Sequence, residues 1–580
     1  MASMHTSDLE ARRHTLAHLL AAAVRELYPH ALPTIGPAID TGFYYDFGDL
    51  HIADEDLPAL ETKMRELLPQ WTEFTHEVVS PAEAHEVFAS NPYKLELIDE
   101  IEKKGETITL YTCGGFTDLC RGGHASAPAK EIKAQSFKLD KLAGAYWRGD
   151  ETKPMLTRIY GLAFDGKAEL DAHIAMMEEA KKRDHRKLGA ELKLFTSSPL
   201  VGAGLPLMQP KGMIVRKEIE DYLWQLHVKK GYSRVWTPHL AKEDLYITSG
   251  HAEKFGDELF RVQGKEEKFF LKPMNCPHHM QIFADNQFSY RDLPVRYFEP
   301  ATVYRDEKSG QLGGLTRVRS ITQDDGHLFC RIDQIHQEVS TIVSVIKEFY
   351  TTMGMIDGYW VRLSLRGPNG KYLGSDTVWE TAEKALTDAA IANELPYEPA
   401  LDEAAFYGPK LDFIFKDAIG REWQLATIQC DFNLPERFDL SFINDKGEKE
   451  RPVVIHRAIS GSLERFMGVM IEHFAGAFPL WLSPVQARVL PVSERHTEYA
   501  QEILSSLRDA GVRAELAADD TLGKRIRNAK LEKVPYTLVI GDAEVEAKTA
   551  TLEGRAGKIG ALPLGEIEAR LLDEIRTRAL

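Results

Sequence analysis

The 580-residue sequence predicts an α+β fold divided into several domains. The chain is far longer than the roughly 150 residues of a typical single domain. Hydrophobic residues make up 43% and charged residues 27%, without the bias of disordered or collagen-like chains. Strand-like and helical segments alternate irregularly through most of the chain, whereas the last hundred residues alternate regularly, so the C-terminal part is expected to be a compact α/β domain.

Changes in pattern divide the chain into four segments. Residues 1–165 mix helices with short strands, and residues 166–188 are charged, with few core positions, as in a linker helix. Residues 189–481 combine strands and helices without a repeat. A break around Pro484 then introduces residues 482–580, in which strand and helix patterns alternate.

Composition excludes several classes of protein. No apolar run of about 18 residues and no signal-peptide core is present, so we expect a cytoplasmic chain without a membrane partner. Five scattered cysteines favour a reducing compartment over a disulfide framework. The net charge of −17 does not favour nucleic acid. One basic helix is a local exception, although a solvated helix face explains it equally well: Lys524, Arg525, Arg527, Lys530 and Lys533.

Two pairs of metal-binding residue types stand near the N-terminus. His14 and His18 are four residues apart on a predicted helix, opposite an apolar stripe, so we expect them outside the core. An exposed pair without a role is the alternative. Cys120 and His124 have the same spacing among glycines. The four side chains suit tetrahedral zinc, and they equally suit general bases that activate water without a metal.

A second candidate site lies in residues 296–329. A strand that ends at Arg305, a Gly-rich loop and a second strand form a predicted hairpin. Alternation on the second strand places six side chains on one face: Arg317, Arg319, Ile321, Gln323, Asp325 and His327. A solvated sheet face is the alternative, but this mixture favours a binding floor. The middle region lacks both a P-loop and a G-x-G-x-x-G motif, so any nucleotide is held in another way.

These segments resemble class II aminoacyl-tRNA synthetases of the threonyl type. The hairpin is similar to motif 2, and GSLERFMGVMIEHF, which includes Arg465, is similar to motif 3. Residues 1–165 resemble the editing domain of threonyl- and alanyl-tRNA synthetases, and KVPYTLVIGDAEVE resembles the anticodon-binding domain. The resemblance implies an antiparallel-sheet catalytic core with an α+β editing domain and a C-terminal α/β domain. It also implies that the small N-terminal β-grasp domain of many relatives is lacking.

The resemblance implies an ATP site that uses Mg²⁺. Arg305 would bind the α-phosphate and the substrate carboxylate, Arg465 would lie against adenine and the γ-phosphate, and Glu307 would contact the adenine amino group. Ile321 stands where the family has a stacking phenylalanine, so weaker ATP binding is expected. The implied ATP-binding set is Arg305, Glu307, Arg317, Ile321, Gln424 and Arg465, and the implied catalytic set is Arg305, Arg465, Lys410 and His251, the last acting on the tRNA ribose.

The resemblance also implies threonine as the substrate. Cys276, His327 and His456 match a catalytic zinc site, one Zn²⁺ per catalytic domain, whose open position suits an amino group and a hydroxyl. A site that ligates the hydroxyl rejects valine by roughly 10⁴-fold, whereas a missing methyl group is worth only about 1–3 kcal/mol, so serine is accepted. The implied pocket is Gln323, Asp325, Tyr407, Gln429 and Ser462.

Serine misactivation explains the first domain, which would hydrolyse seryl-tRNA(Thr). The implied editing residues are His14, His18, Tyr45, Lys94, Asp118, Cys120 and His124. Gly123 replaces a proline that is usual in the family. Glu544 matches an anticodon contact, while Glu553 replaces a common arginine.

The expected protein is therefore a homodimeric enzyme that charges tRNA(Thr) with L-threonine from ATP. A regulatory or tRNA-binding paralogue without aminoacylation is the alternative, and only Ile321 and Glu553 favour it. Activation of another amino acid would predict a broken Cys276, His327 and His456 triad, and the triad is intact.

Overall fold

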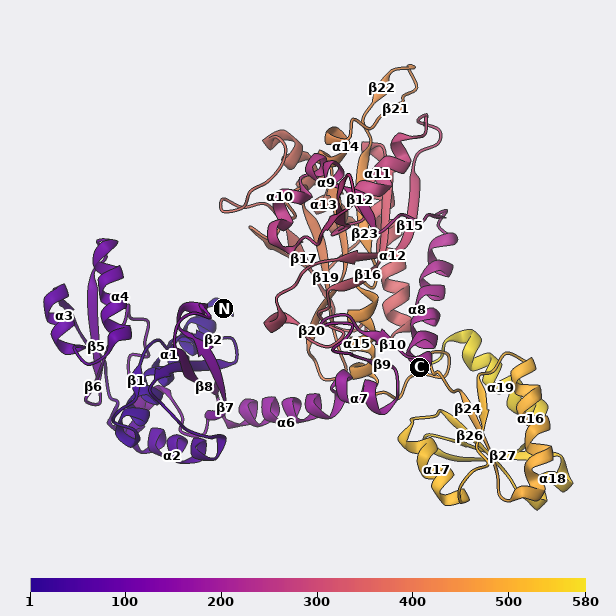
Figure 1. Cartoon of the computed structure of the whole chain (residues 1–580), viewed down its shortest axis with the longest axis horizontal. Helices are drawn as coiled ribbons and strands as arrows, with labels where there is room; N and C mark the ends of the chain where they lie inside the picture. The colour runs from indigo at the N-terminus through magenta and orange to yellow at the C-terminus, as the bar shows by residue number, and fades with distance from the viewer. Residues whose placement is uncertain (1) are drawn as a thin grey trace. The chain divides into compact units, whose positions relative to one another are not determined.

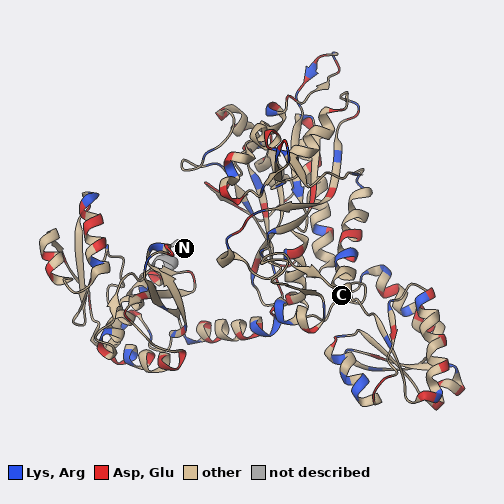
Figure 2. Cartoon of the chain, viewed as in Figure 1, with Lys and Arg blue, Asp and Glu red and all other residues tan. Residues whose placement is uncertain are grey.

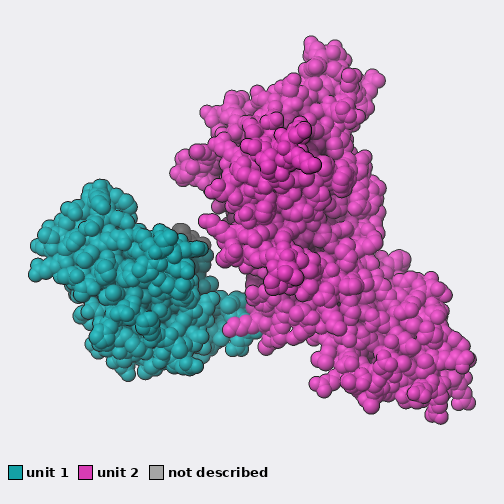
Figure 3. All heavy atoms as spheres, viewed as in Figure 1, with its two compact units in different colours: residues 1–178 teal, residues 179–580 magenta. Residues whose placement is uncertain are grey.

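The structure, a computed structural model, describes residues 2–580, with side chains of the first helix described from Asp8 onward. The chain forms two compact units, residues 1–178 and 179–580 (Figure 3). Helix α6 (Lys167–Arg183) runs across the boundary, and Leu170 is its one buried residue. The α+β multidomain fold is confirmed. Among the described helices, none combines the length and the apolar character of a membrane span.

The first unit contains a five-stranded sheet beside a long helix (Figure 1). The strand order is β1-β3-β8-β7, and β2 pairs with β3; the strands are β1 (Leu32–Pro33), β2 (Ala38–Ile39), β3 (Gly42–Gly48), β7 (Phe137–Tyr146) and β8 (Met155–Ala163). Helix α1 (Ala2–Leu27) contacts β2, β3, α2 (Leu57–Leu67) and α5 (Pro128–Glu131). Because it is covered on several sides, residues 15–24 are all buried, and the prediction of a single apolar stripe with histidines outside the core is wrong for His18.

A smaller sheet in the same unit carries further site residues. It consists of β4 (Thr75–Val79), β5 (Ile108–Cys113) and β6 (Phe116–Leu119), and it packs against α3 (Pro81–Val87) and α4 (Pro92–Lys103). Asp118 lies on β6 and Lys94 lies in the first turn of α4. The side chain of Asn91 caps α4 by accepting hydrogen bonds from the N–H groups of Tyr93 and Lys94. This cap fixes the turn from which Lys94 extends.

The second unit is built on an eight-stranded sheet, ordered β11-β15-β16-β23-β20-β19-β17-β18. The strands are β11 (Ser233–Arg234), β15 (Val295–Tyr304), β16 (Ser320–Cys330), β17 (Trp360–Ser364), β18 (Tyr397–Ala400), β19 (Lys410–Lys416), β20 (Glu422–Asp431) and β23 (Val453–Ala458). The six inner strands pair antiparallel, and only the two edge pairs are parallel. The helices that contribute to its largest core include α8 (Pro210–Val228), α12 (Ile335–Thr352), α13 (Asp376–Ala392) and α15 (Leu463–His473).

Two boundaries differ from the sequence prediction. Strand β16 begins at Ser320, so Arg317 and Arg319 lie in the preceding loop rather than on the strand. The backbone N–H of Arg319 donates to Gly204 O, although its carbonyl oxygen still accepts the N–H of Arg305. Residues 166–188 form two helices instead of one, since α7 (His185–Glu191) begins after α6 ends, and His185 and Leu188 on α7 are buried.

The C-terminal part confirms the regular strand–helix alternation. Its sheet has the order β25-β24-β26-β27-β28: β24 (Ala487–Pro491), β25 (Ala514–Leu516), β26 (Tyr536–Ile540), β27 (Thr549–Gly554) and β28 (Gly557–Pro563). Helices α16 (Thr497–Asp509) and α17 (Leu522–Leu531) connect its parallel strands. A separate core forms between this sheet, α16 and α19 (Leu564–Thr577).

Candidate functional site

A cavity of ≈ 760 Å³ lies over the inner strands of the large sheet. Its walls come from β16, β19, β20 and β23, from the loop between β15 and β16, and from the start of α15. Most of the residues that the sequence predicted for nucleotide and amino-acid binding line it: Arg305, Glu307, Arg317, Ile321, Gln323, Asp325, His327, Tyr407, Lys410, Gln424, Gln429, His456, Ser462 and Arg465. The fold therefore brings residues separated by up to 160 positions around one space.

Two guanidinium groups in this cavity have no acidic partner among the described residues. Arg305 donates only to Pro273 O (3.4 Å) and to the sulfur of Met274 (3.1 Å), and it lies 4.9 Å above the ring of Phe255. Nε of Arg465 is buried without a hydrogen-bond partner. Burial lowers the pKa of both groups. Two half-buried cations without counterions form a site prepared for an anion.

The other polar groups of the cavity are held by each other. Arg317 forms an ion pair with Glu307 at 2.7 Å, and Lys410 forms one with Asp412 at 2.5 Å. Tyr407 donates its hydroxyl to Gln429 Oε1 at 2.6 Å. Burial raises the pKa of Asp325, although neighbouring imidazoles oppose that shift. These contacts fix the orientation of the lining side chains before any ligand arrives.

Two imidazoles of the cavity wall, His327 and His456, converge with a buried thiol, that of Cys276. Potential ligand atoms of Cys276, His327 and His456 lie within 4.8 Å of one another, and all three side chains are buried. Cys276 begins α11 (Cys276–Ala284), while His327 and His456 face each other on β16 and β23. One sulfur and two nitrogen donors are a ligand set typical of catalytic zinc sites, in which a water or substrate completes the coordination.

Two partners of these imidazoles were missed from the sequence. His456 Nε2 lies 2.8 Å from Asp431 Oδ2, and His327 Nδ1 lies 2.8 Å from His279 Nδ1. His279 in turn approaches Glu299 Oε2 at 3.1 Å. Each bond engages one ring nitrogen and leaves the other for a metal, as is usual around zinc. The sequence signal for His279 was its position three residues after Cys276 on one helix; nothing local pointed to Asp431.

His251 does not line the cavity. It is fully buried, with Nδ1 2.7 Å from Ser249 Oγ and Nε2 3.5 Å from the sulfur of Cys276. Burial lowers its pKa to about 3. In this arrangement the imidazole contacts the thiol of Cys276, and its action on the tRNA ribose stays a prediction.

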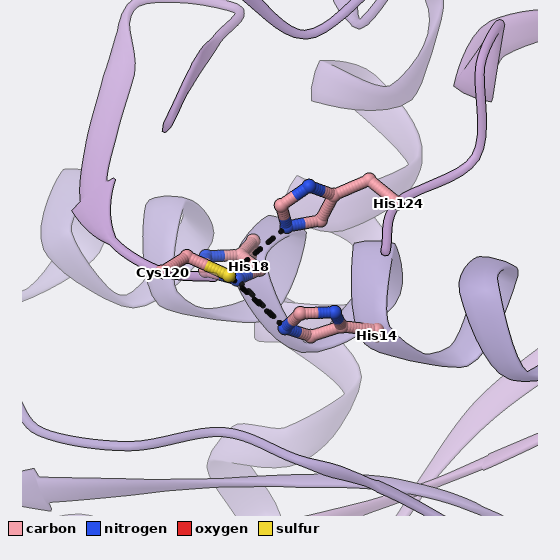
Figure 4. Close-up of side chains that lie close together, drawn as sticks. All are labelled: His14, His18, Cys120 and His124. Atoms are coloured by element: carbon pink, nitrogen blue, oxygen red, sulfur yellow. Dashed lines mark hydrogen bonds between the residues drawn. The ribbon is translucent and has the colours of Figure 1, made fainter. Parts of the chain in front are cut away.

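The two predicted pairs near the N-terminus do meet (Figure 4). The sulfur of Cys120 lies 3.5 Å from Nε2 of His14 and 3.5 Å from Nε2 of His124. Nε2 of His18 lies 3.2 Å from Nε2 of His14. Gly122 and Gly123, with φ of +93° and +85°, turn the chain between Cys120 and His124. Side chains from α1 and from the loop after β6 thus form one four-residue cluster.

A buried network of Asp118, Tyr45 and Lys94 contacts this cluster through His18. Asp118 accepts hydrogen bonds from Tyr45 and from Lys94 Nζ (2.5 Å), and it lies 3.1 Å from Nδ1 of His18. Burial opposes a charge on His18, but Asp118 and Cys120 outweigh it and raise the pKa of His18 to about 9. Cys120 also borders a separate cavity of ≈ 320 Å³, whose lining includes Arg121 and Arg148. All seven residues expected for the first site therefore lie together.

The residues predicted for the C-terminal domain, Glu544 and the basic residues near α17, do not converge on one site. Glu544 Oε2 accepts the N–H of Gly541 and Oε1 accepts the hydroxyl of Thr551, so both oxygens are engaged within the domain. On the basic helix α17, Arg525 is buried and donates to Pro491 O and Ala517 O. It therefore does not contribute to the predicted basic surface. The other four basic residues are exposed: Lys524, Arg527, Lys530 and Lys533. Figure 2 shows Lys and Arg positions in blue along α17.

Comparison with known proteins agrees with this architecture. Residues 260–474 match the family described as tRNA synthetase class II core domain (G, H, P, S and T), and residues 486–574 match the anticodon binding domain. The antiparallel sheet, the cavity with two unpaired arginines and these matches define a class II aminoacyl-tRNA synthetase.

The chain belongs to the threonine–tRNA ligases, also called threonyl-tRNA synthetases. It is 49% identical to the threonine–tRNA ligase of Rubrobacter xylanophilus over 94% of this chain and 85% of that one. The ligase of Dehalococcoides mccartyi is 47% identical over 99% and 98% of the two chains. A solved RNA-binding domain of threonyl-tRNA synthetase from Cryptosporidium parvum matches with a TM-score of 0.65 and 37% identity, covering 67% of this chain and 98% of that one.

Proposed function

We propose that this chain activates L-threonine with ATP in the 760 Å³ cavity, transfers it to tRNA(Thr), and hydrolyses seryl-tRNA(Thr) at the N-terminal cluster. The observation that carries the first part is the pair of uncompensated guanidinium groups facing the same space as the imidazoles of His327 and His456, which converge with the thiol of Cys276. An adenylate-forming site needs cations for phosphates and a separate anchor for the amino acid. This cavity offers both.

In this proposal Arg305 binds the α-phosphate and the threonine carboxylate. As the carboxylate attacks phosphorus, negative charge grows on the phosphate oxygens, and a guanidinium fork placed in advance stabilises it without reorganisation. Arg465 holds the γ-phosphate, and Glu307, fixed by Arg317, contacts adenine. Magnesium would accompany ATP, bound mainly through the phosphates. Ile321 offers adenine an apolar contact in place of an aromatic one.

Threonine selection is proposed to depend on zinc held by Cys276, His327 and His456. When bound, the metal would take the amino group and the side-chain hydroxyl of the substrate as ligands, which valine cannot match. Tyr407 and Gln429, hydrogen-bonded to each other, would shape the space around the methyl group. Asp325 would accept the threonine hydroxyl.

Editing is proposed for the N-terminal cluster because serine satisfies the same anchor. His14 and His124 would position a water for attack on the seryl ester, while His18, paired with Asp118, would orient that network. The same four side chains could hold a metal instead. Zinc analysis of the purified chain distinguishes a metal-bound cluster from a metal-free one. The adjoining 320 Å³ cavity, with Arg121 and Arg148, would admit the tRNA end.

We further propose that the enzyme is a cytoplasmic homodimer. The support is an exposed aromatic side chain: Trp236, two residues after the end of β11, is 74% exposed. Tryptophan on a surface is typical of protein interfaces. Sedimentation of the purified chain tests this part separately, since a monomer would contradict it.

The test of the activation step is ATP–pyrophosphate exchange with threonine, serine and valine, before and after prolonged removal of zinc by a chelator. We expect exchange with threonine, weaker exchange with serine, none with valine, and loss of activity on zinc removal that added zinc restores. No exchange with any amino acid from folded, zinc-loaded protein would refute the proposal and favour the non-catalytic alternative.

The editing step has its own test. Seryl-tRNA(Thr) should be hydrolysed by the wild-type chain, and His18→Ala should slow hydrolysis about 10²-fold or more while leaving threonine exchange unchanged. His30→Ala, on an exposed histidine outside the cluster, is the control. Equal hydrolysis by His18→Ala and the control would contradict the assignment. Metal analysis of Cys276→Ser combined with His327→Ala and His456→Ala, which removes all three donors of the other candidate site, shows whether the N-terminal cluster binds zinc.

A further inference from the structure

One buried imidazole outside the cavity touches three elements at once. His185, the first residue of α7, is 5% exposed. Its Nδ1 lies 2.6 Å from Glu472 Oε1 on α15, and its Nε2 accepts the backbone N–H of Leu315 at 3.0 Å. Leu315 lies in the loop between β15 and β16, whose neighbouring residues Gly313, Thr316 and Arg317 line the proposed ATP cavity.

The two bonds fix the tautomer. Because Leu315 N–H can only donate, Nε2 must be the acceptor, and the proton stands on Nδ1, where it is donated to the carboxylate of Glu472. Asp184, His185 and Glu472 lie close enough together to suggest a metal site. Both ring nitrogens of His185 are already used, however, so no ligand atom remains on the imidazole.

The surroundings make this contact specific. A Cβ added at Gly314 would lie 2.2 Å from Nε2 of His185, and Gly314 has φ of +58°. On α15, a Cβ added at Gly468 would lie 3.3–3.4 Å from Thr316 and Leu315. The loop therefore lies directly against the imidazole and against the helix that carries Arg465, and two glycines allow that approach.

The C-terminal end of α6 also contacts the end of α15, next to Glu472. Arg183, the last residue of α6, donates to the backbone oxygen of His473 at 2.9 Å. The second carboxylate oxygen of Glu472 pairs with Arg421. Glu472 is thus held between Arg421 and His185, and it fixes the position of the His185 imidazole relative to α15.

We propose that His185 is a positioning residue for ATP binding: it fixes the loop of residues 313–317 against α15 through the N–H of Leu315. This rests on the proposed ATP site. The loop would otherwise lose one of the bonds that hold Arg317 and its partner Glu307 in place. ATP affinity, rather than the chemical step, should depend on this bond, because His185 touches no reacting atom.

Two substitutions of His185 distinguish the effects of its hydrogen bonds to Glu472 and to Leu315. His185→Asn retains a donor near the Nδ1 position for Glu472 and loses the acceptor for Leu315, whereas His185→Gln places an amide oxygen near the Nε2 position. In threonine-dependent pyrophosphate exchange we expect His185→Asn to raise KM for ATP roughly 10-fold, with kcat and KM for threonine changed less than about twofold. His185→Gln should remain closer to the wild type. His336→Asn, on an exposed histidine of α12, is the control.

Amide hydrogen exchange provides a readout that does not depend on activity. Residues 309–319 should exchange faster in His185→Asn than in the wild type, while the peptide of α15 remains protected. Unchanged KM for ATP together with unchanged exchange of this loop would overturn the proposal, as would equal effects of Asn and Gln. Loop exchange that responds as expected in a chain without pyrophosphate exchange would support the contact and refute the ATP site.

Gly314→Ala tests the same contact if His185→Asn does not fold. Its methyl group would displace the imidazole from Leu315, so it should raise KM for ATP in the same way, and a wild-type KM would overturn the proposal. If both single variants fold, the double variant should be little worse than either, because both remove one bond. Additive effects would contradict a shared contact.

Discussion

Individual charged side chains in this molecule are distinguished by whether the protein compensates them. Arg317 and Lys410 have acidic partners within 2.7 Å, whereas Arg305 and Arg465, in the same cavity, have none among the described residues. Leaving a half-buried cation unpaired costs free energy that a ligand can recover on binding. The distinction therefore separates side chains that organise the cavity from side chains available to a substrate.

Replacement of Arg305 by lysine tests this difference. A lysine keeps the charge but loses the planar fork, so we expect kcat for threonyl-adenylate formation to fall about 10²–10³-fold. Thermal stability should change little, because Arg305 forms no ion pair. Arg331→Lys, on a surface arginine paired with Asp333, is the control and should keep full activity. A wild-type kcat for Arg305→Lys would remove Arg305 from the catalytic assignment.

Gly123 has a specific consequence for the proposed editing site, the cluster of His14, His18, Cys120 and His124. Its φ of +85° is inaccessible to proline, whose ring holds φ near −65°. The residue usual in the family at this position therefore does not fit the backbone found here. We expect Gly123→Pro to displace His124 and to slow seryl-tRNA hydrolysis at least 10-fold, without affecting threonine activation.

The deacylation rate of Gly123→Pro decides that point, with Gly105→Ala as a control at another glycine of positive φ away from the cluster. An increase in hydrolysis would mean that the loop adopts the conformation typical of relatives and that its glycines play no part in placing His124.

At the scale of elements, strand pairing and helix capping place the functional groups. The pairing of His327 with His456 across β16 and β23 brings two proposed zinc ligands together from distant positions. The start of α15 is held by Ser462, whose hydroxyl accepts the N–H of Arg465 at 3.2 Å. The same cap that begins the helix thus fixes the backbone of the arginine proposed to bind the γ-phosphate.

Ser462→Ala should have two effects. Loss of the cap should lower the free energy of unfolding by about 1 kcal/mol, and the looser first turn should raise KM for ATP several-fold. Chemical denaturation and pyrophosphate exchange measure these separately. Ser375→Ala, at the N-cap of α13 where the side chain forms no cap bond, should leave both unchanged. Lower stability with unchanged KM would show that the cap does not position Arg465.

At the scale of the whole molecule, the C-terminal part is joined to the catalytic part of the second unit by side chains of α8. Lys211 pairs with Glu532 at 2.8 Å and Glu218 pairs with Arg513 at 2.6 Å. Glu532 also pairs with Arg488 at 2.9 Å. Burial opposes its ionisation, but hydrogen bonds from Arg488 and Lys211 outweigh burial and lower the pKa of Glu532 to about 2.

This shift gives stability a defined pH dependence. The folded pKa is depressed from 4.5 to about 2, so the contribution is fully present above pH 4.5 and is lost as pH falls from 4.5 towards 2. Because Glu532 is partly exposed, we expect only about 1 kcal/mol. Glu532→Gln should therefore lower Tm at pH 7, and its difference from the wild type should shrink between pH 4.5 and 3. Glu498→Gln, on an exposed residue of α16 without an ion pair, should match the wild type throughout.

Much of this architecture could be predicted from local patterns. The alternation of residues 321–327 placed Ile321, Gln323, Asp325 and His327 on one face because the side-chain period of a strand is 2, and all four line the cavity. The spacing of four in His14 and His18 and in Cys120 and His124 predicted two adjacent pairs. The resemblance to class II synthetases extended these patterns to residues that no spacing rule connects.

Burial was decided by tertiary structure. His18 was expected outside the core, and Arg525 was expected on a basic surface, yet both are buried. Helical periodicity describes one helix, and it cannot show how many sides are covered by other elements.

Sequence alone determined the residue types available for chemistry, the periodicities of the elements and, through motif resemblance, the family. Only the tertiary structure decided which of these groups are compensated: Asp431 beside His456, His279 beside His327, and His185 beneath Leu315. Hydrogen bonds require donor and acceptor within about 3 Å. Between residues tens or hundreds of positions apart, that condition is met by packing of the whole chain, which no local pattern contains.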